Sequence, residues 1–124
     1  MAFILIVEDN DDIAPLEIAL ASIDGFAIKL LRNGQRALEL LRTGTRDLAA
    51  VLTDLRLPVI DGFELVAAIR AQHQYRTLPV IVISGDTDPD VAKRVSELGA
   101  NAFFTKPYSP AEVRQTLEGL LYAP

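Results

Sequence analysis

The 124-residue chain contains no cysteine and a single histidine, His73. Without cysteine there are no disulfide bonds, no thiolate zinc site and no thiol chemistry, which fits a reducing compartment and favours a cytoplasmic location. The histidine lies in a polar stretch that indicates a loop, and no second histidine is present to form a metal or relay site. No uncharged apolar run reaches the roughly 18 residues of a membrane span, so we expect no membrane partner.

Basic residues are also few: 12 lysines and arginines stand against 17 acids, which gives a net charge of −5. Because nucleic-acid binding needs a concentrated basic surface and the arginines are scattered, we expect no direct contact with nucleic acid. Repeats, low-complexity tracts and Ser/Gly-rich linkers are absent, while half of the residues are apolar. We therefore expect one domain over residues 1–124, with no output domain in this chain.

The chain does contain five apolar runs that alternate with five helical patterns. The first, third and fourth runs are continuously apolar, as is typical of strands that are covered on both faces. Regular alternation with short connections predicts a parallel sheet with helices on both of its faces. The expected strands are Phe3–Val7, Ala27–Leu31, Ala50–Thr53, Val80–Ser84 and Asn101–Thr105.

Capping residues mark where four of the helices begin, namely Asn33, Asp61, Asp88 and Ser109. The first helix differs, because Pro15 falls in its first turns and predicts a late start. This helix is also apolar nearly all round, with Ala14 and Ile18 forming a second stripe beside the core stripe. Ile18 is therefore either a contact for a partner or a residue at the edge of the core.

Polar groups follow four of the five expected strands. They are Glu8 and Asp9 after the first strand, Asp54 after the third, Ser84 with Gly85 at the end of the fourth, and Lys106 after the fifth. In a parallel sheet, ligands bind beyond these carboxyl ends. Carboxylates crowded there need a cation, and hard oxygen ligands open to water suit Mg²⁺.

This set of groups suits phosphoryl transfer. A carboxylate such as Asp54 can form an acyl phosphate, while a metal and the Lys106 ammonium balance the charge of the transferred group. The Ser84 hydroxyl can donate to a phosphoryl oxygen, and Gly85 leaves room for its approach. Taken alone, Asp54 is better explained as a capping carboxylate, and Glu8 with its acidic neighbours can be explained as a helix start.

The chain resembles the receiver domain of two-component response regulators along residues 1 to about 121. The resemblance rests on Glu8-Asp9, on Asp54 followed by Leu57-Pro58-Val59-Ile60-Asp61-Gly62, on Ser84-Gly85 and on Lys106-Pro107. Each motif is weak by itself, but all of them occur in order and each follows an expected strand. The resemblance implies a flavodoxin-like (βα)5 fold with strand order 2-1-3-4-5.

The resemblance also implies a role for each matching position. Asp54 is the expected phosphoacceptor, which receives a phosphoryl group from a phosphohistidine. Mg²⁺ (or Mn²⁺) is the expected metal, bound directly by Asp9, by Asp54 and by the backbone carbonyl of Arg56, with Glu8 acting mainly through water. Lys106 is expected to contact the phosphoryl group, and its bond to Pro107 is expected to be cis.

The resemblance also implies residues that respond to phosphorylation, that tune the acyl-phosphate lifetime or that dock the phosphoryl donor. Ser84 is expected to move toward the phosphate while Phe103, at the aromatic switch position, turns inward; the alternative is that Phe103 is simply a core residue. The surface of the fourth helix, fifth strand and fifth helix then changes for a downstream target or a homodimer. Arg56 and Asp86 are expected to tune the acyl-phosphate lifetime, and Ala14 and Ile18 to dock a histidine kinase or histidine phosphotransfer protein.

Three other functions can be compared with this interpretation. An aspartate-nucleophile phosphatase needs an acid two residues after the nucleophile, where Arg56 stands, and a flavodoxin needs a Ser/Thr/Gly-rich first loop. A phosphorylation-independent pseudo-receiver remains the alternative, although such modules lose site residues that this chain keeps. Because the expected switch has no external substrate, we do not expect an enzyme in the usual sense.

Overall fold

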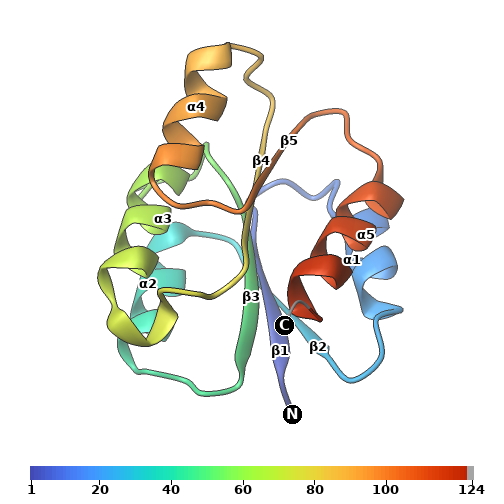
Figure 1. Ribbon diagram of the computed structural model, residues 1–124. Helices are drawn as coiled ribbons and strands as arrows, with labels where there is room; N and C mark the ends of the chain where they lie inside the picture. The colour runs from blue at the N-terminus through green and yellow to red at the C-terminus, as the bar shows by residue number, and fades with distance from the viewer. Residues whose placement is uncertain (123–124) are drawn as a thin grey trace.

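The computed structural model describes residues 1–122, in which one five-stranded parallel sheet is sandwiched between helices (Figure 1). The strand order is β2-β1-β3-β4-β5, which confirms the predicted flavodoxin-like topology. The elements in chain order are β1 (Phe3–Val7), α1 (Ala14–Ala21), β2 (Ala27–Leu31), α2 (Gly34–Arg42), β3 (Leu48–Asp54), α3 (Gly62–Ala71), the 3-10 helix η1 (His73–Tyr75), β4 (Val80–Ser84), α4 (Pro89–Glu97), β5 (Ala102–Thr105) and α5 (Pro110–Leu121).

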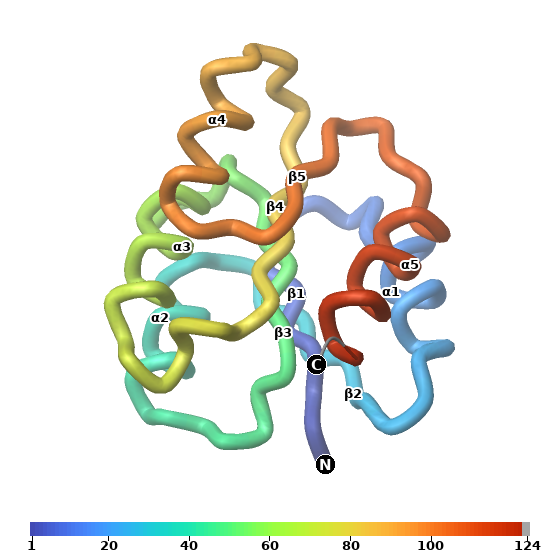
Figure 2. Tube along the Cα trace, in the orientation of Figure 1, coloured from blue at the N-terminus to red at the C-terminus, as the bar shows by residue number. Residues whose placement is uncertain are grey.

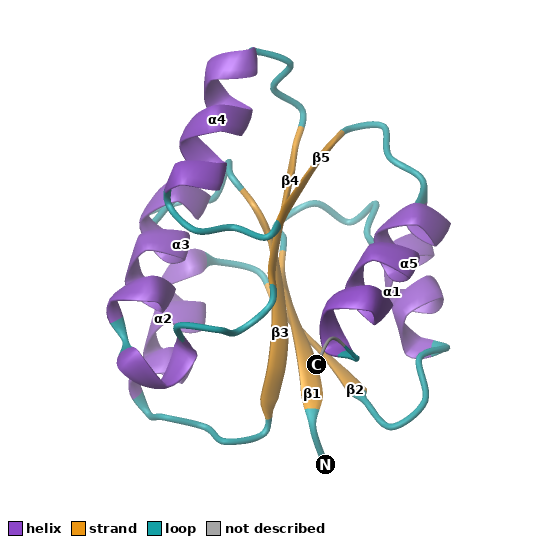
Figure 3. Cartoon of the chain, viewed as in Figure 1, coloured by secondary structure: helices purple, strands orange, loops and turns teal. Residues whose placement is uncertain are grey.

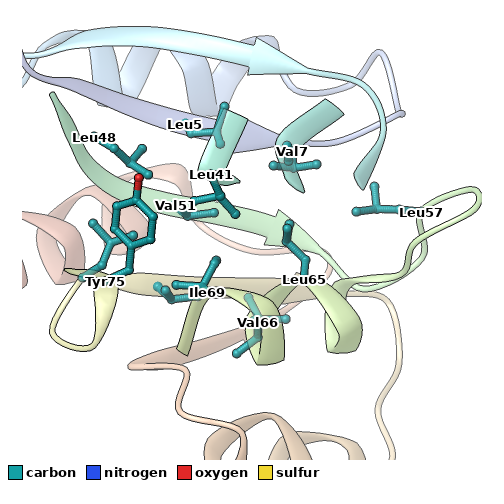
Figure 4. Packing of buried hydrophobic residues seen from close by; sticks show 14 of the residues in the cluster. Leu5, Val7, Leu41, Leu48, Val51, Leu57, Leu65, Val66, Ile69 and Tyr75 are labelled. Carbon is teal, nitrogen blue, oxygen red and sulfur yellow. The ribbon is translucent and has the colours of Figure 1, made fainter. Parts of the chain in front are cut away.

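The helices divide between the two faces of the sheet: α1 and α5 cover one, while α2, α3 and α4 cover the other (Figure 3). Because side chains alternate along a strand, β1 supplies both layers of the core. Leu5 and Val7 pack with α2 and α3, as Figure 4 shows, whereas Ile4 and Ile6 pack toward α1 and α5. None of the helices within residues 1–122 is long and apolar enough to cross a membrane.

Three strand boundaries differ from the prediction. β3 begins at Leu48 rather than Ala50, because Leu48 pairs with Phe3 across a register shift that precedes the Ile4–Ala50 pair. β5 begins at Ala102, because the Asn101 side chain instead accepts hydrogen bonds that close the turn before the strand. At its carboxyl end, β3 also extends by one residue to include Asp54.

The predicted caps are confirmed at the starts of α2, α3, α4 and α5, where each side chain accepts a backbone N–H of the first turn. Helix α1 starts late, as Pro15 predicts. It begins at Ala14 without a side-chain cap, and Pro15 lies in its first turn, where a missing N–H breaks no helical bond. The late start leaves residues 8–13 as a loop beyond the end of β1, as the chain trace in Figure 2 shows.

We predict that Gly62→Ala destabilises the protein by about 1–3 kcal/mol, the usual cost of overpacking. A Cβ at this position would lie 2.4 Å from the Asp54 carbonyl oxygen and 2.7 Å from the Leu55 Cα, so backbone atoms would have to move. The matched control is Gly119→Ala in α5, where a Cβ meets no described atom within 4 Å.

The control is expected to stabilise the protein by about 0.5–1 kcal/mol, because alanine is the better helix former. Urea unfolding at 25 °C measures both free energies. Equal effects of the two substitutions would contradict the close approach at Gly62.

Candidate functional site

The carboxyl ends of β1 and β3 and the loop after β5 bring three charged side chains together. The Lys106 Nζ lies 2.6 Å from the Asp54 Oδ2 and 3.1 Å from the Glu8 Oε2, and it donates a hydrogen bond to each. Both carboxylates are nearly enclosed, with Glu8 3% and Asp54 6% exposed. The parallel order of the sheet makes this contact possible, because β1 and β3 are neighbours.

The electrostatics of the three groups are coupled. Burial, together with the neighbouring Asp54, raises the pKa of Glu8 from 4.5 to about 7. Burial acts the same way on Asp54, but hydrogen bonds from Lys106 and from the Arg56 backbone N–H outweigh it and lower the pKa of Asp54. Burial lowers the pKa of Lys106, yet its two carboxylate partners dominate and raise it. Asp54 is thus held ionised, as a nucleophile must be.

Ser84 completes this end of the sheet from β4. Its side chain is fully buried, and its Oγ accepts the backbone N–H of Asp86 at 3.0 Å. The neighbouring Gly85 is exposed, and a Cβ built on it meets no described atom within 4 Å. Protein packing therefore does not require glycine there, so its suggested role of leaving room for a phosphoryl group stays a prediction.

Arg56 and Asp86 face each other across the opening of the site. The guanidinium Nη2 lies 3.7 Å from the Asp86 Oδ2, so the two opposite charges form an ion pair. Beneath the pair is a cavity of about 250 Å³, lined by Leu55, Arg56, Asp61, Phe63, Ser84, Asp86 and Val91. The Arg56 backbone N–H also donates to the Asp54 Oδ1 at 3.0 Å, which fixes the orientation of the carboxylate.

Asp9 is the predicted site residue that the structure does not join to the others. It is exposed, and within residues 1–122 its side chain makes no hydrogen bond or ion pair. The described residues accordingly form no cluster of three or more His, Cys, Asp or Glu side chains around one point. Lys106 instead supplies the positive charge between the Glu8 and Asp54 carboxylates.

The donor set nevertheless fits a hard divalent cation. Carboxylate oxygens of Glu8, Asp9 and Asp54, with the Arg56 carbonyl, are the oxygen ligands that Mg²⁺ takes, and an exposed Asp9 leaves space for metal-bound water. The Asn10 backbone N–H donates to the Glu8 Oε1 at 3.1 Å, and this bond fixes the start of the loop of residues 8–13. The site can therefore hold Mg²⁺ with these residues as ligands.

The remaining predicted features are Phe103, the Lys106–Pro107 bond and the α1 residues Ala14 and Ile18. Phe103 is half-buried on β5 and packs against the core layer of α3 and α4, so it contributes to the core, and its role as a switch stays a prediction. The Lys106–Pro107 bond is cis, as expected. Ala14 is exposed and Ile18 is 72% exposed, which rules out a place for Ile18 at the edge of the core.

Two contacts were missed at the level of sequence. Arg32, directly after β2, donates from Nη1 to the Asp11 Oδ1 at 2.7 Å and so links the end of β2 to the loop of residues 8–13. Tyr108 is half-buried beside a cleft of about 390 Å³ that also contacts Glu8, Pro15 and Lys106. Tyr108 directly follows the cis proline, and that position was the available signal.

Comparison with known proteins agrees with this geometry. Residues 4–118 match the family described as the response regulator receiver domain, so the chain belongs to that family. It is 37% identical over 121 residues to a probable methanogenesis regulatory protein, FilR2, of Methanothrix harundinacea, covering 93% of this chain and 78% of that one. It is also 31% identical over 105 residues to the autoinducer sensor kinase/phosphatase CqsS of Vibrio cholerae, covering 84% of this chain and 15% of the kinase.

Solved structures show the same fold. The receiver domain of the Pseudomonas aeruginosa sensor histidine kinase PA1611, solved with magnesium in its active-site cleft, matches with a TM-score of 0.82 and 30% identity over 97% of each chain. The chemotaxis response regulator CheY4 of Vibrio cholerae matches with a TM-score of 0.81 and 28% identity over 97% of this chain and 98% of that one. Receiver domains of two-component systems bind divalent metals and interact with histidine kinases.

We predict that Lys106→Met lowers the free energy of unfolding by about 2 kcal/mol at neutral pH. Asp54 would then lose its cation, and Glu8 would either repel it or take up a proton. The cost is below that of a fully buried pair because the Lys106 side chain is 30% exposed. Lys29→Met, at an exposed position of β2, is the matched control, and urea unfolding without divalent metal is the measurement.

Adding Glu8→Gln to Lys106→Met is expected to recover part of the loss, since it removes one of the two facing charges. A loss no larger than that of Lys29→Met would show that the ammonium does not balance the carboxylates.

Proposed function

We propose that the chain is a phosphorylation switch that accepts a phosphoryl group from a partner's phosphohistidine on its own Asp54. The observation that supports this most is the Lys106 ammonium 2.6 Å from a nearly enclosed, ionised Asp54 at the carboxyl end of β3. An ordinary capping carboxylate lies in solvent and needs no such partner. His73 is exposed on η1, so the donor is another protein or a small acyl phosphate.

In the transfer, an Asp54 Oδ attacks phosphorus while the P–N bond to the partner's imidazole breaks, and the released imidazole nitrogen takes up a proton. Asp9, Asp54 and the Arg56 carbonyl, with Glu8 through water, would hold Mg²⁺, which would supply positive charge for the phosphoryl oxygens. Lys106 neutralises the developing negative charge, and the Ser84 hydroxyl donates to a phosphoryl oxygen. Hydrolysis of the acyl phosphate by water resets the switch.

Formation of the acyl phosphate then changes the surface formed by α4, β5 and α5. Ser84 moves toward the phosphoryl group, and Phe103 turns further into the core. A downstream protein or a second copy of the chain binds the changed surface. We infer that the only substrate on this route is the chain itself, so it acts as a signalling switch and not as an enzyme on external substrates.

We expect Asp54→Asn to abolish phosphorylation by acetyl phosphate in the presence of Mg²⁺, because the amide is not a nucleophile. Intact mass spectrometry should detect the addition of one phosphoryl group to the wild type. Asp61→Asn is the matched control, since asparagine caps α3 as well as aspartate does and the side chain lies outside the Lys106 contact. A phosphorylated Asp54→Asn protein would refute the proposal.

The exposed stripe of α1 is the proposed contact for the phosphoryl donor. Ile18→Arg should slow transfer from the cognate kinase or phosphotransfer protein by about tenfold or more, because a charge replaces an apolar contact. Labelling by acetyl phosphate should not change, since Ile18 lies outside the site. Gln35→Arg, which adds the same charge at an exposed position of α2, should transfer normally. Full transfer to Ile18→Arg would exclude this face.

The ion pair of Arg56 with Asp86 is proposed to restrict the attacking water. Arg56→Ala is therefore expected to shorten the half-life of the acyl phosphate, which is measured by decay of labelled protein after removal of the donor. Arg36→Ala, which removes an exposed arginine from α2, serves as the control. An unchanged half-life in Arg56→Ala would show that the pair does not regulate hydrolysis.

A further inference from the structure

Strand β2 is the outermost strand on one side of the sheet, and no strand of residues 1–122 pairs with its outer edge (Figure 3). All five of its residues are exposed or half-buried, whereas four of the five residues of β1 beside it are buried. An unpaired strand edge presents backbone donors and acceptors on which another chain can form a further strand. The outer edge of β2 is therefore a candidate site for an extended peptide.

The outward-pointing backbone groups of β2 follow from its bonds to the neighbouring chain. The Ala27 N–H donates to the Ala2 carbonyl at 3.0 Å, and the Leu31 carbonyl accepts the Glu8 N–H at 3.0 Å. Along a strand in a parallel pair, every second residue bonds to the same neighbour. Residues 27, 29 and 31 therefore bond toward β1, and the two residues between them point their N–H and C=O groups to the free edge, namely Ile28 and Leu30.

The side chains of β2 divide between the two faces of the sheet by the same alternation. Ile28 and Leu30 pack with the core layer under α1 and α5, whereas Leu31 packs with the layer under α2 and α3. Lys29 is exposed, and its side chain leaves the strand on the same face as that of Leu31. A strand added at the free edge would thus have apolar neighbours on one face and a lysine on the other.

The segment from β2 through α2 is basic in a chain that is acidic overall. Residues 27–42 contain four bases and one acid, a charge of +3, whereas the other residues hold 8 bases and 16 acids. Arg32 pairs with Asp11, but within residues 1–122 the other three bases of this segment form no ion pair. We define the basic edge as the outer edge of β2 together with these three exposed bases of β2 and α2, which are Lys29, Arg36 and Arg42.

We propose that the basic edge binds an extended acidic segment of another protein, which adds to the sheet as a sixth strand beside β2. Main-chain hydrogen bonds to Ile28 and Leu30 hold the segment. Acidic side chains at every second position lie on the α2 face of the added strand, where the unpaired bases attract them. Apolar side chains at the positions between them extend the core layer that contains Ile28 and Leu30.

The chemistry of the basic edge favours such a segment over two other occupants. Nucleic acid has no repeat of amide donors and carbonyl acceptors, so it would leave the free backbone groups of β2 unpaired. A second copy of the chain paired through β2 would bring two basic edges together, and a lysine on an edge strand is a usual protection against such pairing. Acidic residues on the incoming strand turn this repulsion into attraction.

The proposal does not rest on phosphorylation, because β1 separates β2 from the strand that carries Asp54. The probe is a fluorescein-labelled peptide of seven residues in which glutamate alternates with valine, and fluorescence anisotropy measures its binding to the full chain at low salt. A peptide with lysine in place of each glutamate should not bind. Added salt should weaken binding of the glutamate peptide, because it screens exposed charges.

A charge reversal at the edge tests the role of the lysine. Lys29→Glu should weaken binding of the glutamate peptide about fivefold or more, because an attraction at the edge becomes a repulsion. Lys93→Glu makes the same change of charge at an exposed position of α4 and is the matched control, so it should bind the peptide like the wild type.

Amide hydrogen exchange measured by NMR shows whether the peptide adds as a strand. At saturating peptide, the N–H groups of Ile28 and Leu30 should exchange about fivefold more slowly, the weight of one hydrogen bond. The Lys29 N–H is already bonded toward β1, so its exchange should stay unchanged and serves as the internal control.

Five results would overturn the proposal. No binding at millimolar peptide excludes the site, and binding without slower exchange at Ile28 and Leu30 reduces it to attraction between charges. Equal binding by Lys29→Glu removes the basic edge from the contact. A single-stranded oligonucleotide that binds where the peptide does not would identify a nucleic-acid surface. Slower exchange of the same two amides at high protein concentration, without peptide, would identify a second copy as the occupant.

Discussion

One ammonium group between two nearly enclosed carboxylates is the interaction on which the rest of the site depends. Lys106 lies 2.6 Å from Asp54 and 3.1 Å from Glu8, and each carboxylate comes from a different strand. Such a contact requires β1 and β3 to be neighbours that end at the same edge, and it requires the loop after β5 to return over them. The order β2-β1-β3-β4-β5 meets the first condition, and the position of Lys106 between the two carboxylates shows that the loop meets the second.

The same contact sets the protonation states of the two carboxyl groups at this edge of the sheet. The lowered pKa of Asp54 keeps it ionised, whereas burial and the neighbouring Asp54 raise the pKa of Glu8 and disfavour a second negative charge there. An arriving phosphoryl group brings further negative charge, so additional positive charge becomes favourable there. The exposed Asp9 lies at the open side of the site, where a hydrated metal ion can reach it. In the proposed function, this charge imbalance connects metal binding, phosphoryl transfer and the response of Ser84.

Much of the fold was predictable because its signals are local. The apolar runs located the strands, and caps such as Asp61 and the turn residues around Gly62 located the helices. Regular alternation of the two predicted the parallel sheet. Strand ends were predicted less well, because pairing decides them: the register shift between Phe3 and Ile4 extends β3 to Leu48. The aromatic Phe103 could be placed on β5, but its degree of burial depends on the packing of α3 and α4.

The sequence indicated which residues lie at this end of the sheet, but it did not indicate which of them contact one another. The type of each group after a strand indicated the chemistry, yet no sequence pattern shows that Lys106 contacts Glu8 while Asp9 remains exposed. Long-range pairs such as Arg32 with Asp11 join segments that are 21 residues apart, and Arg70 reaches Asn101 across 31 residues. Contacts of this kind follow from the way helices and loops are brought together and leave no local signal.

The most direct test of the central claim is a crystal structure of the chain grown with Mg²⁺ and beryllofluoride. We predict beryllofluoride bonded to an Asp54 oxygen, Mg²⁺ in contact with Asp9, Asp54 and the Arg56 carbonyl, and the Lys106 ammonium moved from Glu8 onto the fluorides. Electron density for an unmodified Asp54 that still pairs with Lys106 at saturating beryllofluoride would contradict the account.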